Sequence, residues 1–236
     1  GLIREGLDEN AMYCIAVIGE GDLPVWPRIG LAMPTVDNAK LATEAISFMA
    51  RTYPGELEFV IVANGSNEET LAELSQTARA IPHVVTLIES EENLGYGPGA
   101  NLGLYELSQH GYDLYGVTND DVLPATACMT ELVMATLALI ESGQRVGMIG
   151  PVSNNINGRQ QVQIGAFSDL PTMMYRAEEH HRANHSSATQ HVQLRGMFFL
   201  CTPSFLQQVG GFDPRFAIGN FEDDDLNLRA RLAGFS

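Results

Sequence analysis

The sequence predicts an α/β protein with a Rossmann-like, mostly parallel sheet and helices on both faces of that sheet. Short apolar runs of strand length alternate with longer stretches whose apolar residues recur at helical spacing. Strict alternation of strand and helix is typical of right-handed crossovers in a parallel sheet. The expected strands span residues 29–34, 57–63, 84–89, 114–118, 146–150 and 197–202, and the expected helices span residues 39–51, 68–80, 99–110 and 124–142.

Two segments depart from this alternation. Residues 1–28 read as an N-terminal extension, in which residues 12–18 are apolar enough to add a strand. Residues 151–194 are polar and rich in Asn, Gln and His, as is typical of a solvated loop. Within them, His181 and His185 have a spacing that also suits zinc when further ligands are present, but no Cys or carboxylate stands at a fixed spacing from them.

The charge balance is strongly acidic, with 13 basic and 29 acidic residues and a formal net charge of -16. Nucleic acid is therefore excluded as a partner, because its binding depends on Lys and Arg that neutralise phosphates. A P-loop NTPase is excluded as well, because Lys40 is the only lysine and lies in no such loop. The three separated cysteines and the lack of an apolar stretch of roughly 20 residues predict a cytoplasmic domain without a membrane span.

An acidic group follows the fourth expected strand, where Asn119, Asp120 and Asp121 come directly after residues 114–118. Open α/β sheets bind ligands at the carboxyl ends of their strands. An Asp pair there suits Mg²⁺, which takes one or two carboxylates and leaves its other positions to water and phosphate oxygens. The simpler interpretation is an Asx-type turn between strand and helix.

A second acidic group, Glu222 to Asp225, stands directly before a run with apolar residues at helical spacing. Like charges this close push their pKa values apart, so such a cluster indicates a helix N-terminus, a cation or a chemical step that uses it. The simpler interpretation is a solvated helix start capped by Asp223 or Glu222. Asp225 would then pair with Arg229. The presence of two acidic groups with complementary roles favours the functional interpretation.

Several motifs occur in a fixed order along the chain. They are Pro34-Thr35, Asn64-Gly65-Ser66, Asn93-Leu94-Gly95-Tyr96-Gly97-Pro98-Gly99-Ala100-Asn101, Asn119-Asp120-Asp121-Val122, Gly210-Gly211-Phe212-Asp213, and Glu222-Asp223-Asp224-Asp225-Leu226 with Arg229. Together they resemble family 2 of the inverting glycosyltransferases, which have the GT-A fold, and especially its rhamnosyltransferase-like members. The resemblance runs from about residue 29 to residue 235.

This resemblance implies a GT-A domain over residues 29–236, with a nucleotide-binding half at about 29–122 and an acceptor-side half at about 123–236. It also implies an enzyme that transfers a sugar, with inversion, from a nucleotide diphosphate sugar to a hydroxyl group. The acceptor would be a glycan or a lipid-linked molecule, as in polysaccharide biosynthesis.

The resemblance also implies roles for single residues. Asp223 corresponds to the general base, Glu222 and Asp225 lie on the acceptor side, and Asn119 and Asp121 would bind Mn²⁺ or Mg²⁺. The residues implied to contact the donor are Pro34, Thr35, Asn64, Ser66, Asn93, Gly95, Asn101 and Asp120.

The chain departs from the family at Ala63, where the family has an Asp that contacts the nucleobase. Either Asn64 replaces that contact or the donor carries a base other than uracil. Two other function classes stay open. Gly95-x-Gly97-x-x-Ala100 weakly fits the fingerprint of an NAD(P)-dependent oxidoreductase, although it follows the third expected strand instead of the first. The second open class is a sugar-nucleotide binder without catalytic activity.

The end of the sequence carries one more expectation. Gly234 is a plausible C-cap for the acidic helix, and the sequence ends at Ser236. The family's fold continues beyond that helix, and the sequence begins at Gly1 without Met. We therefore expect a C-terminally truncated domain.

Overall fold

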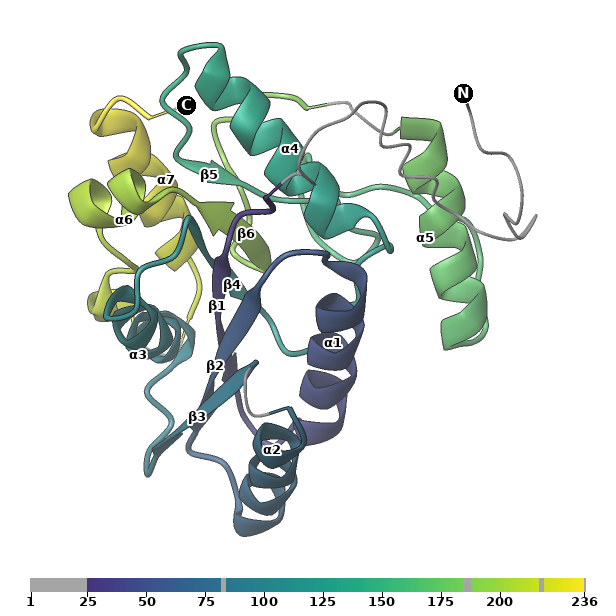
Figure 1. Ribbon diagram of the computed structural model, residues 1–236, viewed down its shortest axis with the longest axis vertical. Coiled ribbons are helices and arrows are strands. Elements are labelled where there is room, and N and C mark those ends of the chain that lie inside the picture. The colour runs from purple at the N-terminus through teal and green to yellow at the C-terminus, as the bar shows by residue number, and fades with distance from the viewer. Residues whose placement is uncertain (1–24, 82–83, 185–187, 217–218, 236) are drawn as a thin grey trace.

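The computed structural model describes residues 25–81, 84–184, 188–216 and 219–235, and it shows a six-stranded sheet with helices on both faces (Figure 1). The strands are β1 (Ile29–Thr35), β2 (Leu57–Asn64), β3 (Val85–Ser90), β4 (Leu114–Thr118), β5 (Met148–Ile149) and β6 (Phe198–Cys201). Their order in the sheet is β3-β2-β1-β4-β6-β5. The first four strands pair in parallel, whereas β6 runs antiparallel to β4 and β5. The predicted α/β fold with a mostly parallel sheet is confirmed.

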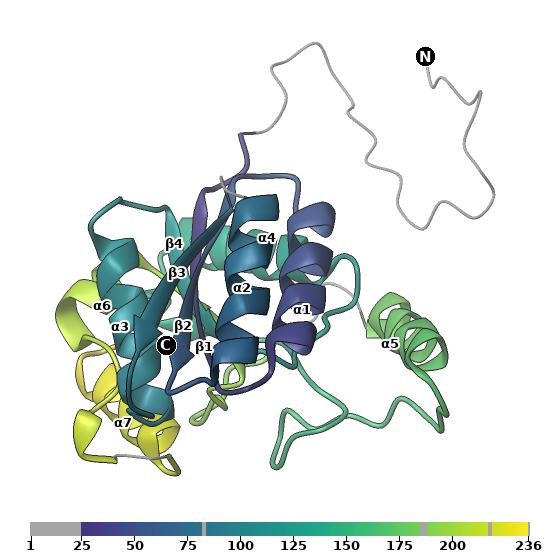
Figure 2. The same ribbon diagram turned by 90° about the horizontal axis from the view of Figure 1, so that it is seen from below.

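The helices divide between the two faces of the sheet, as Figure 2 shows. One face carries α1 (Ala39–Thr52), α2 (Glu68–Ala80) and α4 (Cys128–Glu141). The other carries α3 (Tyr96–Ser108), α6 (Pro203–Val209) and α7 (Glu222–Leu232). A further helix, α5 (Leu170–Asn184), stands beside these layers in both ribbon views. A short 3-10 helix (Pro214–Phe216) precedes α7.

The central strand β1 is buried on both faces, which is why its sequence is apolar along its whole length. Ile29, Leu31 and Met33 belong to the core beneath α1, α2 and α4. Ala32 belongs to the core beneath α3, α6 and α7. Gly30 faces the same side as Ala32, and a Cβ there would lie 2.7 Å from the Leu107 side chain. Side-chain alternation along one strand therefore builds both cores.

Three expected elements differ from the structure by more than one residue at an end. α3 begins at Tyr96 instead of residue 99, because Pro98 lies in the first helical turn, where backbone N–H groups lack intrahelical partners. α4 begins at Cys128 instead of residue 124, after a turn in which the Thr126 N–H bonds to the Glu178 carboxylate at 2.5 Å. The expected strand at 146–150 is reduced to the two residues of β5.

The prediction of a solvated loop over residues 151–194 is wrong in its middle, where α5 forms. The side chain of Asp169 accepts the Thr172 N–H at 2.8 Å, a capping contact that starts this helix. Glu178 is its buried residue and anchors it to the turn before α4. The polar composition misled the prediction because α5 buries so little of its surface.

Helix α6 was not predicted, although the sequence carries its start signal. Thr202 caps it by accepting the Phe205 N–H at 3.2 Å, and Pro203 occupies the first turn. The strand expected at residues 12–18 lies outside the described residues.

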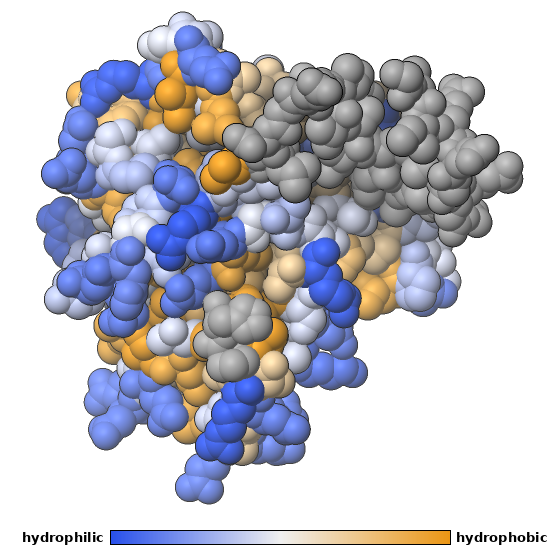
Figure 3. All heavy atoms as spheres, viewed as in Figure 1, coloured by the Kyte–Doolittle hydropathy of each residue, from blue (hydrophilic) through white to orange (hydrophobic). Residues whose placement is uncertain are grey.

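Hydrophilic side chains cover much of the face shown in Figure 3, with hydrophobic side chains between them. Cys128 and Cys201 are free thiols, and burial raises the pKa of each to about 12. Within the described part of the chain, no helix is both long and apolar enough to cross a membrane.

The strand order reverses direction between β1 and β4, so chain segments leave the sheet on opposite sides at that point. In open α/β sheets, the crevice outside the carboxyl ends of such strands is where ligands bind. Thr35, Asn64 and Thr118 are the last residues of β1, β2 and β4. The predicted site residues follow directly after them.

Candidate active site

A pocket of about 380 Å³ opens at the carboxyl ends of β1 and β2. Its lining includes five residues that the sequence predicted to contact a donor, namely Pro34, Thr35, Asn64, Asn93 and Asp120. The lining residues that the sequence analysis missed are Val36, Asp37, Asn38 and Tyr96. The signal for the first three was their place directly after a buried parallel strand.

Asp120 points back toward β1. The hydroxyl of Thr35 donates a hydrogen bond of 2.5 Å to its carboxylate. Burial raises the pKa of Asp120, and the hydrogen bonds from Thr35 and Asn38 oppose that rise. Ser66 approaches the same strand end, where its hydroxyl donates to the Thr35 carbonyl oxygen at 3.4 Å. Asp120 is thus held in the pocket wall, while its neighbour Asp121 is exposed.

Asn64 holds the loop that precedes α3. Its Nδ2 donates to Asn93 Oδ1 at 3.2 Å and to the Gly95 carbonyl oxygen at 3.0 Å, and its Oδ1 accepts the Leu94 N–H at 2.9 Å. Both hydrogens of its amide are therefore used within the protein. Ala63 beside it is fully buried. These contacts give Asn64 and Asn93 a structural role in the pocket wall. They do not favour Asn64 as a replacement for the nucleobase-contacting Asp that the family has at the position of Ala63.

The glycines of the dinucleotide-like motif are explained by packing inside the protein. Gly95 precedes α3 with a φ of 87°, a conformation that favours glycine. A Cβ at Gly97 would lie 3.0 Å from the Phe212 side chain, and a Cβ at Gly99 would lie 3.0 Å from Asn64. Close approach of α3 to its neighbours thus accounts for these residues without a dinucleotide.

The second acidic group forms the first turn of α7. The residue before this helix is Phe221, in a left-handed conformation with a φ of 70° and without a side-chain capping bond. The expectation that Asp223 or Glu222 caps the helix is therefore wrong, because the helix begins one residue earlier than that expectation requires. Four carboxylates at a helix N-terminus are favoured by the helix dipole.

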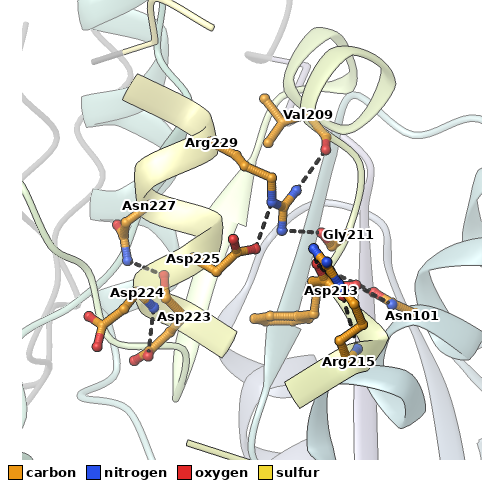
Figure 4. Close-up of polar contacts among 11 residues, drawn as sticks. Asn101, Val209, Gly211, Asp213, Arg215, Asp223, Asp224, Asp225, Asn227 and Arg229 are labelled. Atoms are coloured by element: carbon orange, nitrogen blue, oxygen red, sulfur yellow. Dashed lines mark hydrogen bonds and ion pairs between the residues drawn. The ribbon is translucent and has the colours of Figure 1, made fainter. Parts of the chain in front are cut away.

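Asp225 has the partner that the simpler interpretation predicted. Arg229 donates to its carboxylate at 2.7 Å, and the same guanidinium donates to the carbonyl oxygens of Val209 and Gly211, each at 2.8 Å (Figure 4). The Asp225–Arg229 ion pair thus ties α7 to the loop after α6. The expected contact between Asp225 and an acceptor stays a prediction.

Asp223 faces a different segment of the chain. Its Oδ2 lies 3.4 Å from the backbone nitrogen of Gly196 and 3.5 Å from Nη1 of Arg195, and its Oδ1 accepts the Asp224 N–H at 2.8 Å. Glu222 carries a buried Oε2 that has no hydrogen-bond partner. Such a buried acceptor is costly unless a ligand satisfies it.

The two acidic groups meet around Tyr96. Its hydroxyl donates to the Gly196 carbonyl oxygen at 2.5 Å. Its pKa is raised first by burial and then by four carboxylates, those of Glu222, Asp223, Asp120 and Asp121. The pairing of the strands brings these segments together. Because β6 runs antiparallel to β4, the residues before β6 lie beside those after β4, and the Met197 carbonyl oxygen accepts the Asn119 N–H at 2.7 Å.

Asn101 lies outside the donor-side pocket. Its side chain accepts the Phe212 N–H at 2.8 Å and donates to the Phe212 carbonyl oxygen at 2.7 Å. It also approaches Gly211 so closely that a Cβ there would lie 2.1 Å from its Oδ1. This geometry gives Asn101 the role of fixing the loop before α7, in place of the donor contact that we expected.

A divalent cation fits the residues after β4. Oδ1 of Asn119 is buried and has no hydrogen-bond partner, so it is free to accept a cation. The side chain of Asp121, two residues on, is exposed and would supply a carboxylate. Two oxygen ligands suit a cation whose remaining positions are taken by water and phosphate. The described residues contain no group of three or more His, Cys, Asp or Glu that could hold a metal ion on its own.

The histidines do not form such a group in the part that the structure describes. His180 and His181 lie on α5, His191 is exposed, and His185 falls outside the described residues.

The profile of a protein family described as "Glycosyltransferase like family 2" matches residues 27–236. Among curated proteins, no sequence match was found. Solved structures with the same fold include the mannosyltransferase PcManGT from Pyrobaculum calidifontis in complex with GDP-Man and Mn²⁺, with 20% identity and a TM-score of 0.59. They also include GalNAc-T7 with UDP, GalNAc and Mn²⁺, with 14% identity and a TM-score of 0.65. A third is S. aureus TarS 1-349 in complex with UDP-GlcNAc, with 16% identity and a TM-score of 0.56.

These alignments cover 89%, 89% and 87% of this chain, and 53%, 41% and 53% of the three solved chains. This chain therefore spans about half the length of the structures that it matches. At this level of identity, the likeness establishes the GT-A fold. The family profile covers nearly all of the described residues, and the chain belongs to the glycosyltransferase-like family 2.

Proposed function

We propose that this chain is the catalytic domain of a metal-dependent, inverting glycosyltransferase. The observation that carries the proposal is the place of Tyr96 between two acidic groups, since it lines a pocket together with Asp120 and bonds to Gly196, whose backbone N–H faces Asp223. One group has the ligands for a cation, and the other has a carboxylate placed for proton transfer. A pocket for a nucleotide adjoins both, because Tyr96 and Asp120 line it.

In this proposal, the nucleotide of the donor lies in the pocket formed by residues after β1 and β2. Pro34 and Thr35 form one wall, and the loop held by Asn64 forms another. The diphosphate extends toward Asn119 and Asp121. A divalent cation bound there would neutralise the charge that develops on the leaving diphosphate. Without it, the acidic surroundings would repel the donor.

Asp223 accepts the proton of the acceptor hydroxyl as that oxygen attacks the anomeric carbon. The carbon–oxygen bond to the acceptor forms on the face opposite the departing diphosphate, which inverts the configuration. A general base must lie within hydrogen-bond reach of the proton that it removes. Asp223 is partly buried, and the adjacent residue, Glu222, is proposed to contact the acceptor.

The acceptor is proposed to be a glycan or a lipid-linked molecule, as in polysaccharide biosynthesis. The absence of a carboxylate at Ala63 and the structural role of Asn64 favour a donor base other than uracil. Structures of the same fold hold GDP-Man in one case and UDP-GlcNAc in another, so the fold accommodates either base.

A thermal-shift screen tests the proposal. Nucleotide diphosphate sugars would be compared with and without Mn²⁺, since a ligand at 100 times its Kd stabilises a protein by about 2.7 kcal/mol. Stabilisation that needs both sugar nucleotide and Mn²⁺ is expected. Stabilisation by NAD(P) would support the oxidoreductase instead. Donor binding by the full-length protein without transfer to any acceptor would support the silent binder.

A further inference from the structure

Arg195 lies beside the predicted base, although no sequence motif pointed to it. Its Nη1 is 3.5 Å from Oδ2 of Asp223 and 3.7 Å from Oδ1 of Asp224. Its side chain is 32% exposed, so these interactions are partly shielded from water. In a chain with 13 basic residues against 29 acidic ones, a guanidinium facing two carboxylates of one helical turn calls for an explanation.

The backbone of Arg195 is held from a segment distant in sequence. Its N–H bonds to Oε1 of Gln160 at 2.6 Å. Gln160 is buried, and its Nε2 donates to the Pro151 carbonyl oxygen at 2.9 Å. Both ends of this amide are therefore used to join the loop after β5 to Arg195. Such a buried and fully bonded amide fixes the position of what it holds.

The residues on either side of Arg195 are held as well. Asn227 on α7 accepts the Leu194 N–H at 2.9 Å and donates to the Leu194 carbonyl oxygen at 2.7 Å. On the other side, the Tyr96 hydroxyl bonds to the Gly196 carbonyl oxygen. Three elements thus clamp this three-residue segment. The backbone that carries the Arg195 side chain is therefore held in place.

We propose that Arg195 is a positioning residue for Asp223, whose carboxylate it orients together with the Gly196 N–H. This inference rests on the proposed function, in which Asp223 is the general base. The guanidinium and the amide both approach Oδ2, while Oδ1 accepts the N–H of the next residue. The plane of the carboxylate is thereby defined before an acceptor arrives, and a preoriented group needs less reorganisation during the reaction.

The test compares Arg195→Gln and Arg195→Lys in the full-length enzyme, with Arg176→Gln as the matched control. Arg176 lies on α5 and pairs with Glu179, away from the site. In Arg195→Gln we expect kcat to fall about tenfold, because the base loses the group that orients it. Affinity for the nucleotide diphosphate sugar with Mn²⁺ should stay within about twofold of wild type. Arg195→Lys should recover part of kcat.

Each outcome decides the matter. If wild type transfers sugar and both Arg195 variants keep its kcat, the inference is overturned while the proposed function stands. If donor affinity falls and kcat at saturation is unchanged, Arg195 binds the donor and the inference is again overturned. Wild-type enzyme that transfers no sugar overturns the proposed function and this inference with it. Melting temperatures identify a variant that fails to fold, in which case Arg195→Lys carries the comparison.

Discussion

Tyr96 at the start of α3 donates a hydrogen bond of 2.5 Å to the carbonyl oxygen of Gly196, which lies just before β6. The bond joins segments from the two halves of the chain. The carboxylates of the turn after β4 and of the first turn of α7 both add to the rise in the pKa of Tyr96, which burial causes first. The relative placement of the two acidic groups therefore depends on this bond.

Tyr96→Phe tests this dependence. The substitution leaves the buried Gly196 carbonyl oxygen without its partner, so the free energy of unfolding should fall by about 1–3 kcal/mol. Sugar transfer should fall as well, because the two acidic groups lose a common support. Urea denaturation and steady-state kinetics measure the two effects. The matched control is Tyr105→Phe, since the Tyr105 side chain is 66% exposed. Equal losses in both variants would show that the Tyr96 hydrogen bond has no special role.

Asp223→Asn should keep the shape of the carboxylate and remove the base. We expect turnover to fall on the order of 10²-fold or more, with little change in donor binding. Asp224→Asn makes the same change in the same helical turn and should cost less activity. Steady-state assays with the full-length enzyme measure both variants. Turnover equal to wild type in Asp223→Asn would exclude Asp223 from the mechanism.

Asp121→Ala should abolish cation-dependent donor binding. The neutral Asn119 then stays as the ligand, and a hard divalent cation needs a carboxylate to hold it against water. Calorimetric titration of a nucleotide diphosphate sugar, with Mn²⁺ and then with EDTA, measures the effect. Wild type should bind more tightly with Mn²⁺, and the variant should bind equally in both conditions. A variant that still responds to Mn²⁺ would place the cation elsewhere.

Asn101→Ala distinguishes the structural role of this residue from the donor contact that the motif implied. Loss of the two hydrogen bonds to the Phe212 backbone should lower the free energy of unfolding by about 2 kcal/mol. Donor affinity should match wild type. The exposed Asn155 supplies the control, since Asn155→Ala should leave stability nearly unchanged. Weaker donor binding in a stably folded Asn101→Ala would restore the original prediction.

The sequence predicted the parallel half of the sheet well because β1, β2 and β4 are buried on both faces and are largely apolar. Both acidic groups were also found, since a strand end and a helix start mark them locally. Helix α5 escaped prediction because its single buried residue, Glu178, is polar. Arg195 and Gln160 escaped because their contacts join residues that are 28 and 35 positions from their partners. No local pattern encodes such pairings.

The structural roles of Asn64 and Asn101 illustrate a second limit of the sequence. Asn64 is the last residue of β2, and Asn101 lies on α3. Their hydrogen bonds go to backbone groups of neighbouring loops instead of an open pocket. A motif indicates where a side chain lies, whereas its bonding partners depend on how distant loops pack around it.

The antiparallel insertion of β6 between β4 and β5 has a consequence for the order in which the protein folds. The pairings of β1 with β2 and of β2 with β3 join strands close in sequence. In contrast, β4 pairs with β1 and with β6 across about 80 residues or more on each side, and long closures come late because of their entropic cost. The strand ends that carry Thr35 and Asn64 can therefore form before the segments that carry Asp121 and Asp223 join them. A partly folded chain would then hold the proposed nucleotide-facing residues without the proposed cation ligands and without the proposed base.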